Sequence, residues 1–324
     1  MRRENAIYPE HTGDRKEWIK KLRPPRNDRD AWQPYAFHNE KELSPDGEMV
    51  DSSVIFLTNK ECPWRCVMCD LWKNTLNETV PEGAIPHQIK TALRNLPKAY
   101  QVKLYNSGSF FDRKAIPVSD YADIAGILKP FKRIIVESHP GLIGEQTLRF
   151  RDMLEGKLEV ALGLETAHPV VLEKLNKGIT IDSFREAAMF LDENEIDLRV
   201  FILVKPPFMN EEEGLEWACR SIDFAFEVKA KVAIVIPTRG GNGAMELLQA
   251  EGLFSPPKLH TLEQALDYGL SLNKGRVFAD LWDLEQFSEC SSCFDSRRQR
   301  LVDLNQAQFY KSYPLCEDCN YLNQ

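Results

Sequence analysis

Short apolar runs rich in β-branched residues alternate with longer amphipathic segments through this chain, and that rhythm constrains the fold more than any other feature. The runs occupy residues 54–58, 102–106, 133–138, 158–165, 198–204 and 231–237, and helices are predicted at about 86–96, 120–129, 144–155, 182–194, 211–228 and 243–251. Nearly continuous apolar strands are typical of a parallel sheet covered by helices. Six strand–helix units therefore predict an α/β fold, a partial (β/α)6 barrel, with a doubly wound open sheet as the alternative.

The rhythm stops on both sides of this region. Residues 1–50 are polar and irregular, and we expect them to form an N-terminal extension of a barrel that spans residues 51–252. Residues 253–324 contain one more predicted helix, after Pro256-Pro257, and two C-x2-C motifs. We therefore expect residues 253–324 to form a small C-terminal metal-binding module.

Composition narrows the class of function. The formal net charge of −8 disfavours binding of nucleic acid through the overall field of the protein, so a basic patch or a basic partner would have to provide such binding. No window approaches twenty consecutive apolar residues, and the N-terminus lacks the apolar core of a signal peptide. We expect a cytoplasmic protein with no membrane contact, in which the eight cysteines are mainly metal ligands rather than disulfides.

Three cysteines, Cys62, Cys66 and Cys69, follow the first apolar run with a C-x3-C-x2-C spacing. Three thiolates on one loop can bind three irons of a [4Fe–4S] cluster and leave the fourth iron open to another ligand. S-adenosylmethionine can take that position, and one-electron reduction then produces a 5′-deoxyadenosyl radical. A structural zinc ion would need a fourth protein ligand, and the neighbouring sequence offers no histidine or further cysteine.

Polar residues follow the other apolar runs, where the carboxyl ends of parallel strands form the functional face of a barrel. These candidates are Ser107, Gly108, Ser109, Glu137, Glu165, Lys205, Thr238 and Arg239. Lys205 could pair with Glu165 or with a substrate carboxylate. The backbone of residues 238–241 could form an anion-binding nest for the ribose or carboxylate of a cofactor, although an ordinary glycine turn fits equally well.

The segment ECPWRCVMCDLW (61–72) resembles the cluster loop of radical-SAM enzymes, although Met68 stands where many of them have an aromatic residue. LYNSGSFFD (104–112) is similar to the motif that binds the methionine amino group in that family, which implies this role for Ser107, Gly108 and Ser109. VESHP (136–140) and LGLETA (162–167) resemble the subgroup that contains the elongator catalytic subunit. That resemblance implies that Glu137 and Glu165 face the cofactor or the substrate.

A narrower resemblance comes from residues 163–188 (GLETAHPVVLEKLNKGITIDSFREAA) and 200–218 (VFILVKPPFMNEEEGLEWA), which look like the radical-SAM subunit of archaeosine synthase. It implies a tRNA substrate that carries a lysine-modified 7-deazaguanine, with lyase cleavage of the lysine carbon–nitrogen bond to leave a formamidine. It also implies a partner subunit that installs the lysine, and an external electron donor of the ferredoxin or flavodoxin type.

The four C-terminal cysteines, Cys290, Cys293, Cys316 and Cys319, suit either a structural zinc ion or an auxiliary [4Fe–4S] cluster. Three arginines lie between the two pairs, at positions 297, 298 and 300, and we interpret them as an RNA-contact patch or as an exposed basic turn.

Two other functions remain open at this stage. One is a radical-SAM enzyme that acts on a small metabolite or peptide, and the other is a non-enzymatic zinc-binding interaction protein. A basic groove at the mouth of the barrel would favour RNA, whereas a closed and mostly apolar pocket would favour a small substrate.

Overall fold

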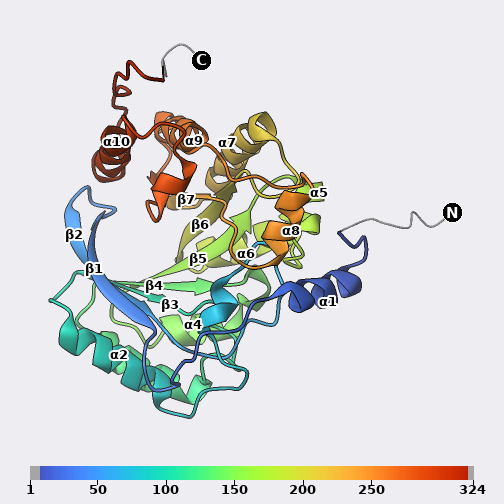
Figure 1. Ribbon diagram of the computed structural model, residues 1–324. Coiled ribbons are helices and arrows are strands. Elements are labelled where there is room, and N and C mark those ends of the chain that lie inside the picture. The colour runs from blue at the N-terminus through green and yellow to red at the C-terminus, as the bar shows by residue number, and fades with distance from the viewer. Residues whose placement is uncertain (1–7, 320–324) are drawn as a thin grey trace.

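The computed structural model describes residues 8–319, which form a curved eight-stranded sheet with helices along its outer side (Figure 1). The strands lie side by side in sequence order from β1 to β8; β1 and β2 are antiparallel, and all later neighbours are parallel. The strands are β1 (Ala36–Leu43), β2 (Met49–Phe56), β3 (Gln101–Tyr105), β4 (Arg133–Ser138), β5 (Lys157–Glu165), β6 (Asp197–Val204), β7 (Val232–Pro237) and β8 (Arg276–Ala279).

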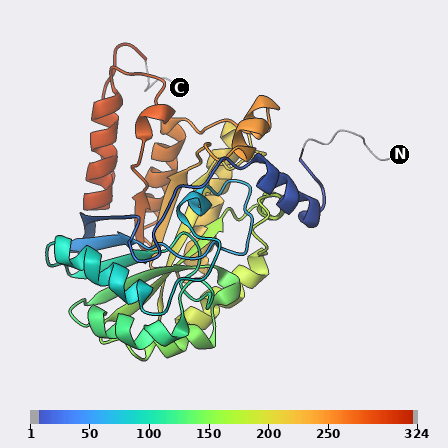
Figure 2. The same ribbon diagram turned by 60° about the horizontal axis from the view of Figure 1, so that its bottom comes forward.

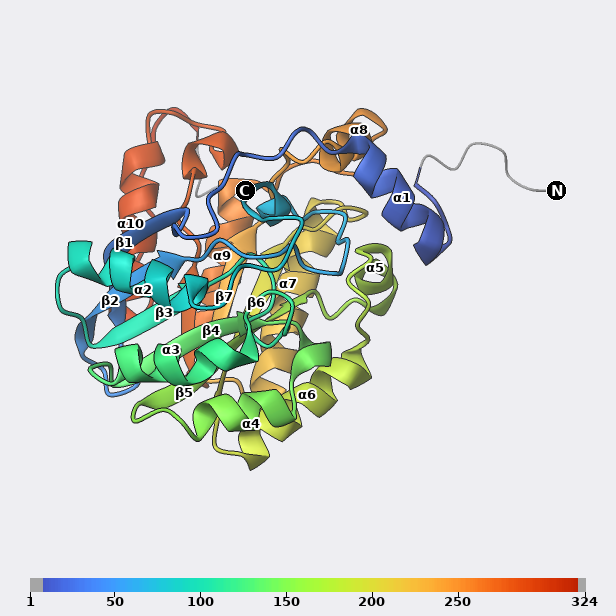
Figure 3. The same ribbon diagram turned by 90° about the horizontal axis from the view of Figure 1, so that it is seen from below.

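The helices include the seven that the sequence predicts and three that it does not, at residues 12–22, 169–174 and 294–307. They are α1 (Thr12–Leu22), α2 (Ala84–Asn95), α3 (Tyr121–Leu128), α4 (Glu145–Arg151), α5 (Pro169–Lys174), α6 (Ile181–Glu193), α7 (Glu211–Glu227), α8 (Ala244–Ala250), α9 (Leu259–Ser271) and α10 (Phe294–Ala307). Side chains such as Thr180 and Asn210 accept from the first turns of α6 and α7, which starts these helices directly after their loops. The outer helices and the sheet enclose one large apolar core (Figures 2 and 3).

The strand order decides between the two predicted architectures. All six predicted strands are present as β2 to β7, and they run in sequence order without a switch point. A doubly wound sheet would reverse its order near the middle. The fold is therefore a half-barrel, and the prediction of a partial (β/α) barrel is confirmed.

Two strands were not predicted. β1 and β8 come from the segments on either side of residues 51–252, yet both belong to the same sheet. The sheet therefore extends past both predicted boundaries, and the division into three parts stays a prediction. Residues 1–7 of the N-terminal extension and residues 320–324 of the C-terminal module lie outside the described residues.

The two edges of the sheet approach each other at the open side of the barrel. Helix α10 contacts both β1 and β8, and the Arg276 guanidinium of β8 donates to the carbonyl oxygen of Leu43 in β1 at 2.7 Å. Within residues 8–319, no ladder of backbone hydrogen bonds joins β1 to β8. A helix and side chains therefore close the barrel where backbone pairing does not.

Charged side chains fill the amino-terminal end of the barrel interior. Four acidic and four basic residues form connected ion pairs there. They are Glu40, Glu42, Lys103, Arg133, Glu159, Asp197, Arg199 and Arg276. Arg199 is fully buried and donates to Glu42 at 2.6 and 3.0 Å and to Glu159 at 2.5 Å. Each of these eight charges has a partner of opposite sign, so this end of the barrel is buried without an unpaired ion.

A smaller apolar cluster lies beside the opposite end of the barrel, where α1, α5 and α8 meet the loop after β2 (Figure 1). Ile19, Val171 and Met245 from these helices share this cluster with Val67 of the loop. The backbone of α1 passes so close to Gly243 that a β-carbon there would overlap the carbonyl oxygen of Leu22. Because Gly243 also has a φ of 88°, glycine is required at this contact. No helix in the described part of the chain has the length and apolar character needed to span a lipid bilayer.

Candidate active site and metal centre

A cavity of about 550 Å³ opens at the carboxyl ends of the strands. Its floor is apolar and consists of Ala161, Phe201, Leu203 and Ile236, which point inward from β5, β6 and β7. Its upper wall is polar and contains the loop after β2, the ends of β3 to β5 and the segment after β8. This position, where loops meet the carboxyl ends of parallel strands, is where barrel enzymes place their active sites.

The three predicted cluster ligands, Cys62, Cys66 and Cys69, all line this cavity. Burial raises the pKa of each of these thiols to about 12. A buried thiolate requires a nearby positive charge, which a bound metal provides. In the described chain, only the C-terminal cysteines form a group of three or more possible ligands close enough to share one ion. The three thiols on the loop therefore do not converge on a single ion, which suits a cluster with three separate irons.

Distant side chains hold the cysteine loop by its backbone carbonyl oxygens. Asn176, just after α5, donates to the Arg65 carbonyl at 2.7 Å. Asn242, just before α8, donates to the carbonyl groups of Val67 and Cys69 at 2.7 and 3.1 Å. Two amides from separate parts of the barrel thus satisfy backbone groups of an irregular loop, which fixes its conformation.

Two of the three residues in the predicted Ser-Gly-Ser motif line the cavity. Ser107 has a φ of 54°, and its hydroxyl lies 3.0 Å from the Tyr35 hydroxyl. A β-carbon at Gly108 would lie 3.3 Å from the β-carbon of Cys62, so glycine lets the two loops meet. The Ser109 hydroxyl instead contacts Ser138 at 2.7 Å and does not line the cavity. Its observed contacts are therefore with neighbouring strand ends.

Glu137 lies at the end of β4 and accepts hydrogen bonds from the backbone amides of Asn106 and Gly108. Burial raises the pKa of its carboxyl group to about 7, although these amide donors favour the ionised form. Glu137 lines the cavity as predicted, and it also supports the Ser-Gly-Ser backbone from the neighbouring strand.

Glu165 lines the cavity at the end of β5, where it pairs with Lys177 at 2.7 Å. Although burial alone would lower it, the Glu165 carboxylate raises the pKa of Lys177 above its ordinary value. A β-carbon at Gly163 would lie 2.6 Å from the Lys177 nitrogen, so glycine makes room for this pair. Sequence reasoning missed Lys177 as a site residue, although it belongs to the Asn-Lys-Gly stretch after α5.

His139 and Trp64 stack in the wall of the cavity, with ring centroids 3.4 Å apart. Burial, helped by the nearby Lys177 charge, lowers the pKa of His139 to about 3. The imidazole is therefore neutral at physiological pH, and its Nδ1 accepts from the Gly141 amide at 3.1 Å.

The structure corrects the prediction that Lys205 could pair with Glu165. The Lys205 ammonium instead donates to Glu211 at 2.6 Å and to Ser255 at 2.8 Å, and it does not line the cavity. Its backbone adopts a left-handed conformation with a φ of 52° at the end of β6. That conformation directs the chain towards α7, so Lys205 supports the loop that starts this helix.

The backbone nest predicted after β7 to bind a cofactor anion instead binds a side chain of the protein itself. The amides of Gly241 and Gly243 both donate to the carboxylate of Glu246, which occupies the anion position. Thr238 lines the cavity, but its hydroxyl donates to the Val204 carbonyl at 2.8 Å. Arg239 lines the cavity as well and pairs with Asp280 at 2.8 Å, which ties the end of β7 to the segment after β8.

The charges of the cavity wall match neither predicted substrate environment. Six carboxylates line the cavity but only three lysine or arginine side chains do. Each of these three cations has a carboxylate partner: Arg23 pairs with Glu61, Lys177 with Glu165 and Arg239 with Asp280. The described cavity is therefore neither a basic groove nor a closed apolar pocket.

The four C-terminal cysteines form a second candidate metal site. Their sulfur atoms all lie within 4.8 Å of one another, and Cys290–Cys316 and Cys293–Cys319 are each separated by 3.8 Å. A tetrahedral ion with Zn–S bonds of about 2.3 Å separates its sulfurs by about 3.8 Å. The thiolates of an iron–sulfur cube project outward from four different irons and lie farther apart. The observed spacing suits a single tetrahedral ion.

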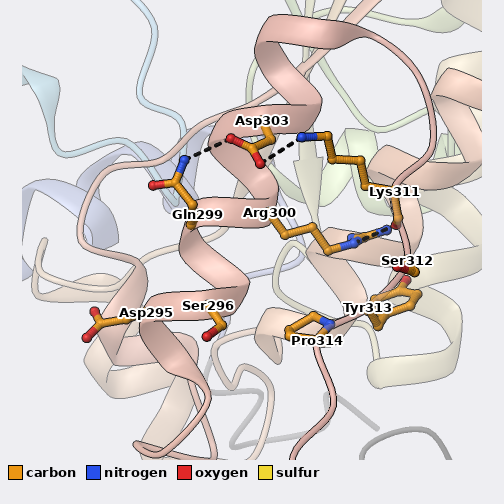
Figure 4. A pocket seen from close by; sticks show the side chains of 9 residues that line it. All are labelled: Asp295, Ser296, Gln299, Arg300, Asp303, Lys311, Ser312, Tyr313 and Pro314. Carbon is orange, nitrogen blue, oxygen red and sulfur yellow. Dashed lines mark hydrogen bonds and ion pairs between the residues drawn. The ribbon is translucent and has the colours of Figure 1, made fainter.

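The arginines between these cysteine pairs do not form the predicted basic patch. Arg297 and Arg300 are buried and pair with Glu263 and Asp267 of α9, each at 2.7 Å. Figure 4 shows Arg300 beside a pocket of about 760 Å³, where its guanidinium also donates to the Lys311 carbonyl at 2.9 Å. Two of the three arginines therefore attach α10 to α9, and only Arg298 is exposed.

Comparisons with known proteins agree with this architecture. An uncharacterized protein of Methanocaldococcus jannaschii is 24% identical over 329 aligned residues, which cover 95% of this chain and 89% of the relative. Archaeosine synthase subunit beta of Methanosarcina acetivorans is 25% identical over 233 residues, 68% of this chain and 67% of the relative. No model of a known protein family matches the sequence.

Among solved structures, an archaeal Elp3 from Methanocaldococcus infernus has a TM-score of 0.52 at 13% identity. The match covers 77% of this chain and 63% of the Elp3 chain, so it spans less than two thirds of that protein. The chain is thus similar in sequence to archaeosine synthase subunit beta over about two thirds of its length, and its half-barrel, with the cysteine loop at the mouth, has the fold of the archaeal Elp3.

Proposed function

We propose that Cys62, Cys66 and Cys69 hold a [4Fe–4S] cluster and that S-adenosylmethionine binds its open iron within the cavity. The observation that carries this proposal is that all three thiols line one cavity without converging on a single ion. A reduced cluster held by these thiols would supply one electron to bound S-adenosylmethionine, and cleavage of the sulfonium would give methionine and a 5′-deoxyadenosyl radical.

The surrounding side chains have distinct roles in this proposal. Ser107 and Gly108 present their backbone to the cofactor next to the cysteine loop, and Glu137 holds that backbone by accepting its amides. The Glu165–Lys177 pair offers a carboxylate and an ammonium group to the cofactor or the substrate. The apolar floor excludes water from the reacting atoms.

The proposed substrate is a tRNA base, a 7-deazaguanine that carries a lysine, and the proposed reaction is lyase cleavage of the lysine carbon–nitrogen bond to leave a formamidine. Support comes from the relatives named archaeosine synthase subunit beta. These relatives are named as a subunit, which also supports a partner protein. The acidic wall of the cavity would repel RNA phosphate, so RNA binding would fall to that partner. The partner would bind the phosphates of the tRNA while this chain receives the modified base. An electron donor of the ferredoxin or flavodoxin type would supply the electron.

One observation favours the alternative, a radical-SAM enzyme that acts on a small metabolite or peptide. Every basic side chain in the described wall of the cavity has a carboxylate partner, so no basic residue there is free to bind RNA phosphate. Cleavage assays with tRNA and with the free lysine-modified nucleoside separate the two cases, because a small-molecule enzyme would act on the nucleoside equally well.

We further propose that the four C-terminal cysteines bind zinc rather than an auxiliary cluster. The sulfur separations of 3.8 Å support a single tetrahedral ion. Anaerobically purified protein should contain about four irons and one zinc per chain if both sites are as proposed. About eight irons and no zinc would show instead that the tail holds a second cluster.

The test of the radical chemistry is formation of 5′-deoxyadenosine from S-adenosylmethionine and dithionite. We expect Cys62→Ala, Cys66→Ala and Cys69→Ala each to abolish this product. Cys219→Ala is the matched control, because Cys219 lies on α7 and does not line the cavity. Normal product formation by any of the three loop variants would contradict the proposed cluster.

A further inference from the structure

A large aromatic side chain, Trp282, stands exposed next to the mouth of the cavity. Its side chain is 63% exposed, although tryptophan is one of the most apolar residues. Its neighbours Asp280 and Asp283 both line the cavity, so the ring lies at the rim and not on a remote surface. An exposed tryptophan beside an active-site opening loses free energy to water unless a ligand covers it.

Contacts from its own loop and from two other segments hold Trp282 in place. The Trp282 amide donates to Asp280 Oδ1 at 3.1 Å, and Arg239 from the end of β7 donates to the Trp282 carbonyl oxygen. The indole ring meets the ring of His38 from β1 edge to face, with centroids 5.8 Å apart. The backbone and one edge of the ring are therefore positioned before any ligand arrives, which lowers the entropy cost of stacking.

Aromatic rings continue from Trp282 into the barrel. His38 lies 5.9 Å from Phe56 of β2, Phe56 lies 5.9 Å from Tyr105 of β3, and Tyr105 lies 6.3 Å from Phe201. Phe201 belongs to the floor of the cavity. Of these rings only Phe201 lines the cavity, so the others connect Trp282 to the barrel interior through packing.

The charges around the ring decide which part of a nucleic acid it can bind. Asp280 is already paired with Arg239, and the exposed carboxylate of Asp283 follows Trp282 directly. Two carboxylates beside the ring repel phosphate, whereas they accept hydrogen bonds from the amino groups of a base. The edge of a base that bears amino groups fits this environment while its face stacks on the ring, and the phosphate backbone does not fit.

We propose that Trp282 is a positioning residue on which the planar base of the substrate stacks at the cavity mouth. The proposal rests on the proposed function, because it takes a modified tRNA base as the substrate. Stacking of one base on an aromatic ring corresponds to roughly a 5- to 140-fold change in affinity. We expect Trp282→Ala to raise the Kd and the KM by a factor in this range, and Trp282→Phe to restore most of the affinity.

The experiment uses cluster-loaded full-length protein with tRNA that carries the lysine-modified 7-deazaguanine, and with the free nucleoside as a second probe. Phe309→Ala is the matched control, because Phe309 is 60% exposed and neither it nor its immediate neighbours in the chain line the cavity. Kd, KM and kcat are measured for both variants, together with 5′-deoxyadenosine formed without substrate.

Each other outcome has a defined meaning. Equal affinities for Trp282→Ala and Phe309→Ala would overturn the stacking role alone. A Trp282→Ala protein whose substrate-free cofactor cleavage falls as far as its affinity would assign the ring a structural or cofactor role, and would also overturn the proposal. Wild-type protein that forms 5′-deoxyadenosine but engages neither probe would refute the proposed substrate, and this proposal with it.

Discussion

Replacement of Arg199 by methionine tests whether the buried charges at the amino-terminal end of the barrel hold the open sheet together. Arg199 is fully buried on β6 and bonds to Glu42 on β1 and to Glu159 on β5, so it joins strands from distant parts of the sheet. The substitution removes the cation that joins Glu42 to Glu159, and it leaves these two buried carboxylates with fewer basic partners.

The magnitude follows from the loss of this partner. Removal of one partner from a buried ion pair costs about 3–5 kcal/mol. With a urea dependence of about 3 kcal/mol per molar, the unfolding midpoint should fall by about 1–1.7 M. Arg298→Met on α10 is the control, because Arg298 is exposed and its replacement should leave the midpoint nearly unchanged.

The pH dependence supplies a second check with a defined sign. Although burial alone would raise it, Arg199 and Lys103 hold the pKa of Glu42 well below its ordinary value. Glu42 therefore contributes stability above its unfolded pKa of about 4.3, and this contribution is lost as the pH falls towards the lower folded pKa. Without Arg199 the pKa of Glu42 in the folded state rises, so acidification lowers the free energy of unfolding of the variant less than that of the wild type.

Urea titrations at pH 7 and near pH 4 measure both effects. The difference between wild type and Arg199→Met should be largest at pH 7 and smaller in acid. A midpoint within about 0.3 M of wild type at pH 7, or a difference that grows in acid, would refute the reasoning.

Three further predictions concern the two candidate sites. Cys290→Ala removes one of the four proposed zinc ligands, so it should abolish metal binding at this site and lower the melting temperature. A cooperatively folded variant with unchanged metal content would contradict this. Lys177→Met and Glu165→Gln each break the same buried ion pair. In a double-mutant cycle, the loss of unfolding free energy in the double variant should therefore be smaller than the sum of the losses in the two single variants. Strictly additive losses would argue against the pair. Gly163→Ala should displace the ends of the Glu165 and Lys177 side chains. Urea titration should show a stability loss of about 1–3 kcal/mol, and 5′-deoxyadenosine formation should fall. Full activity would show that the pair tolerates displacement.

Local patterns in the sequence were enough to predict the central part of the fold. The six strands from β2 to β7 are short apolar runs between amphipathic helices, and both features repeat at a spacing visible within ten to twenty residues. The outer strands were missed for a physical reason. The inward face of β1 carries Glu40 and Glu42, and β8 has only four residues, so neither shows the alternation of a half-buried strand.

Some residues of the candidate site could likewise be predicted from the sequence, and others could not. The three cysteines, Glu137 and Glu165 could be placed because each follows a recognisable strand, and strand ends share one face of a parallel barrel. Lys205 also follows a strand, yet its ammonium points to Glu211, and Lys177 from another loop pairs with Glu165. The sequence contains both lysines but does not specify which one turns inward.

By itself, the sequence determined the six parallel strands with their helices, the three-cysteine loop after the first of these strands and the two cysteine pairs of the tail, because each depends on residues close together in the chain. The strand order in the folded sheet then decided for a half-barrel over a doubly wound sheet. Only the tertiary structure decided which charges are buried, as with Arg199, Arg297 and Arg300, and which aromatic ring stands at the rim. The energy of a buried charge or an exposed ring depends on groups contributed by distant segments, and these groups come together only when the whole sheet has formed.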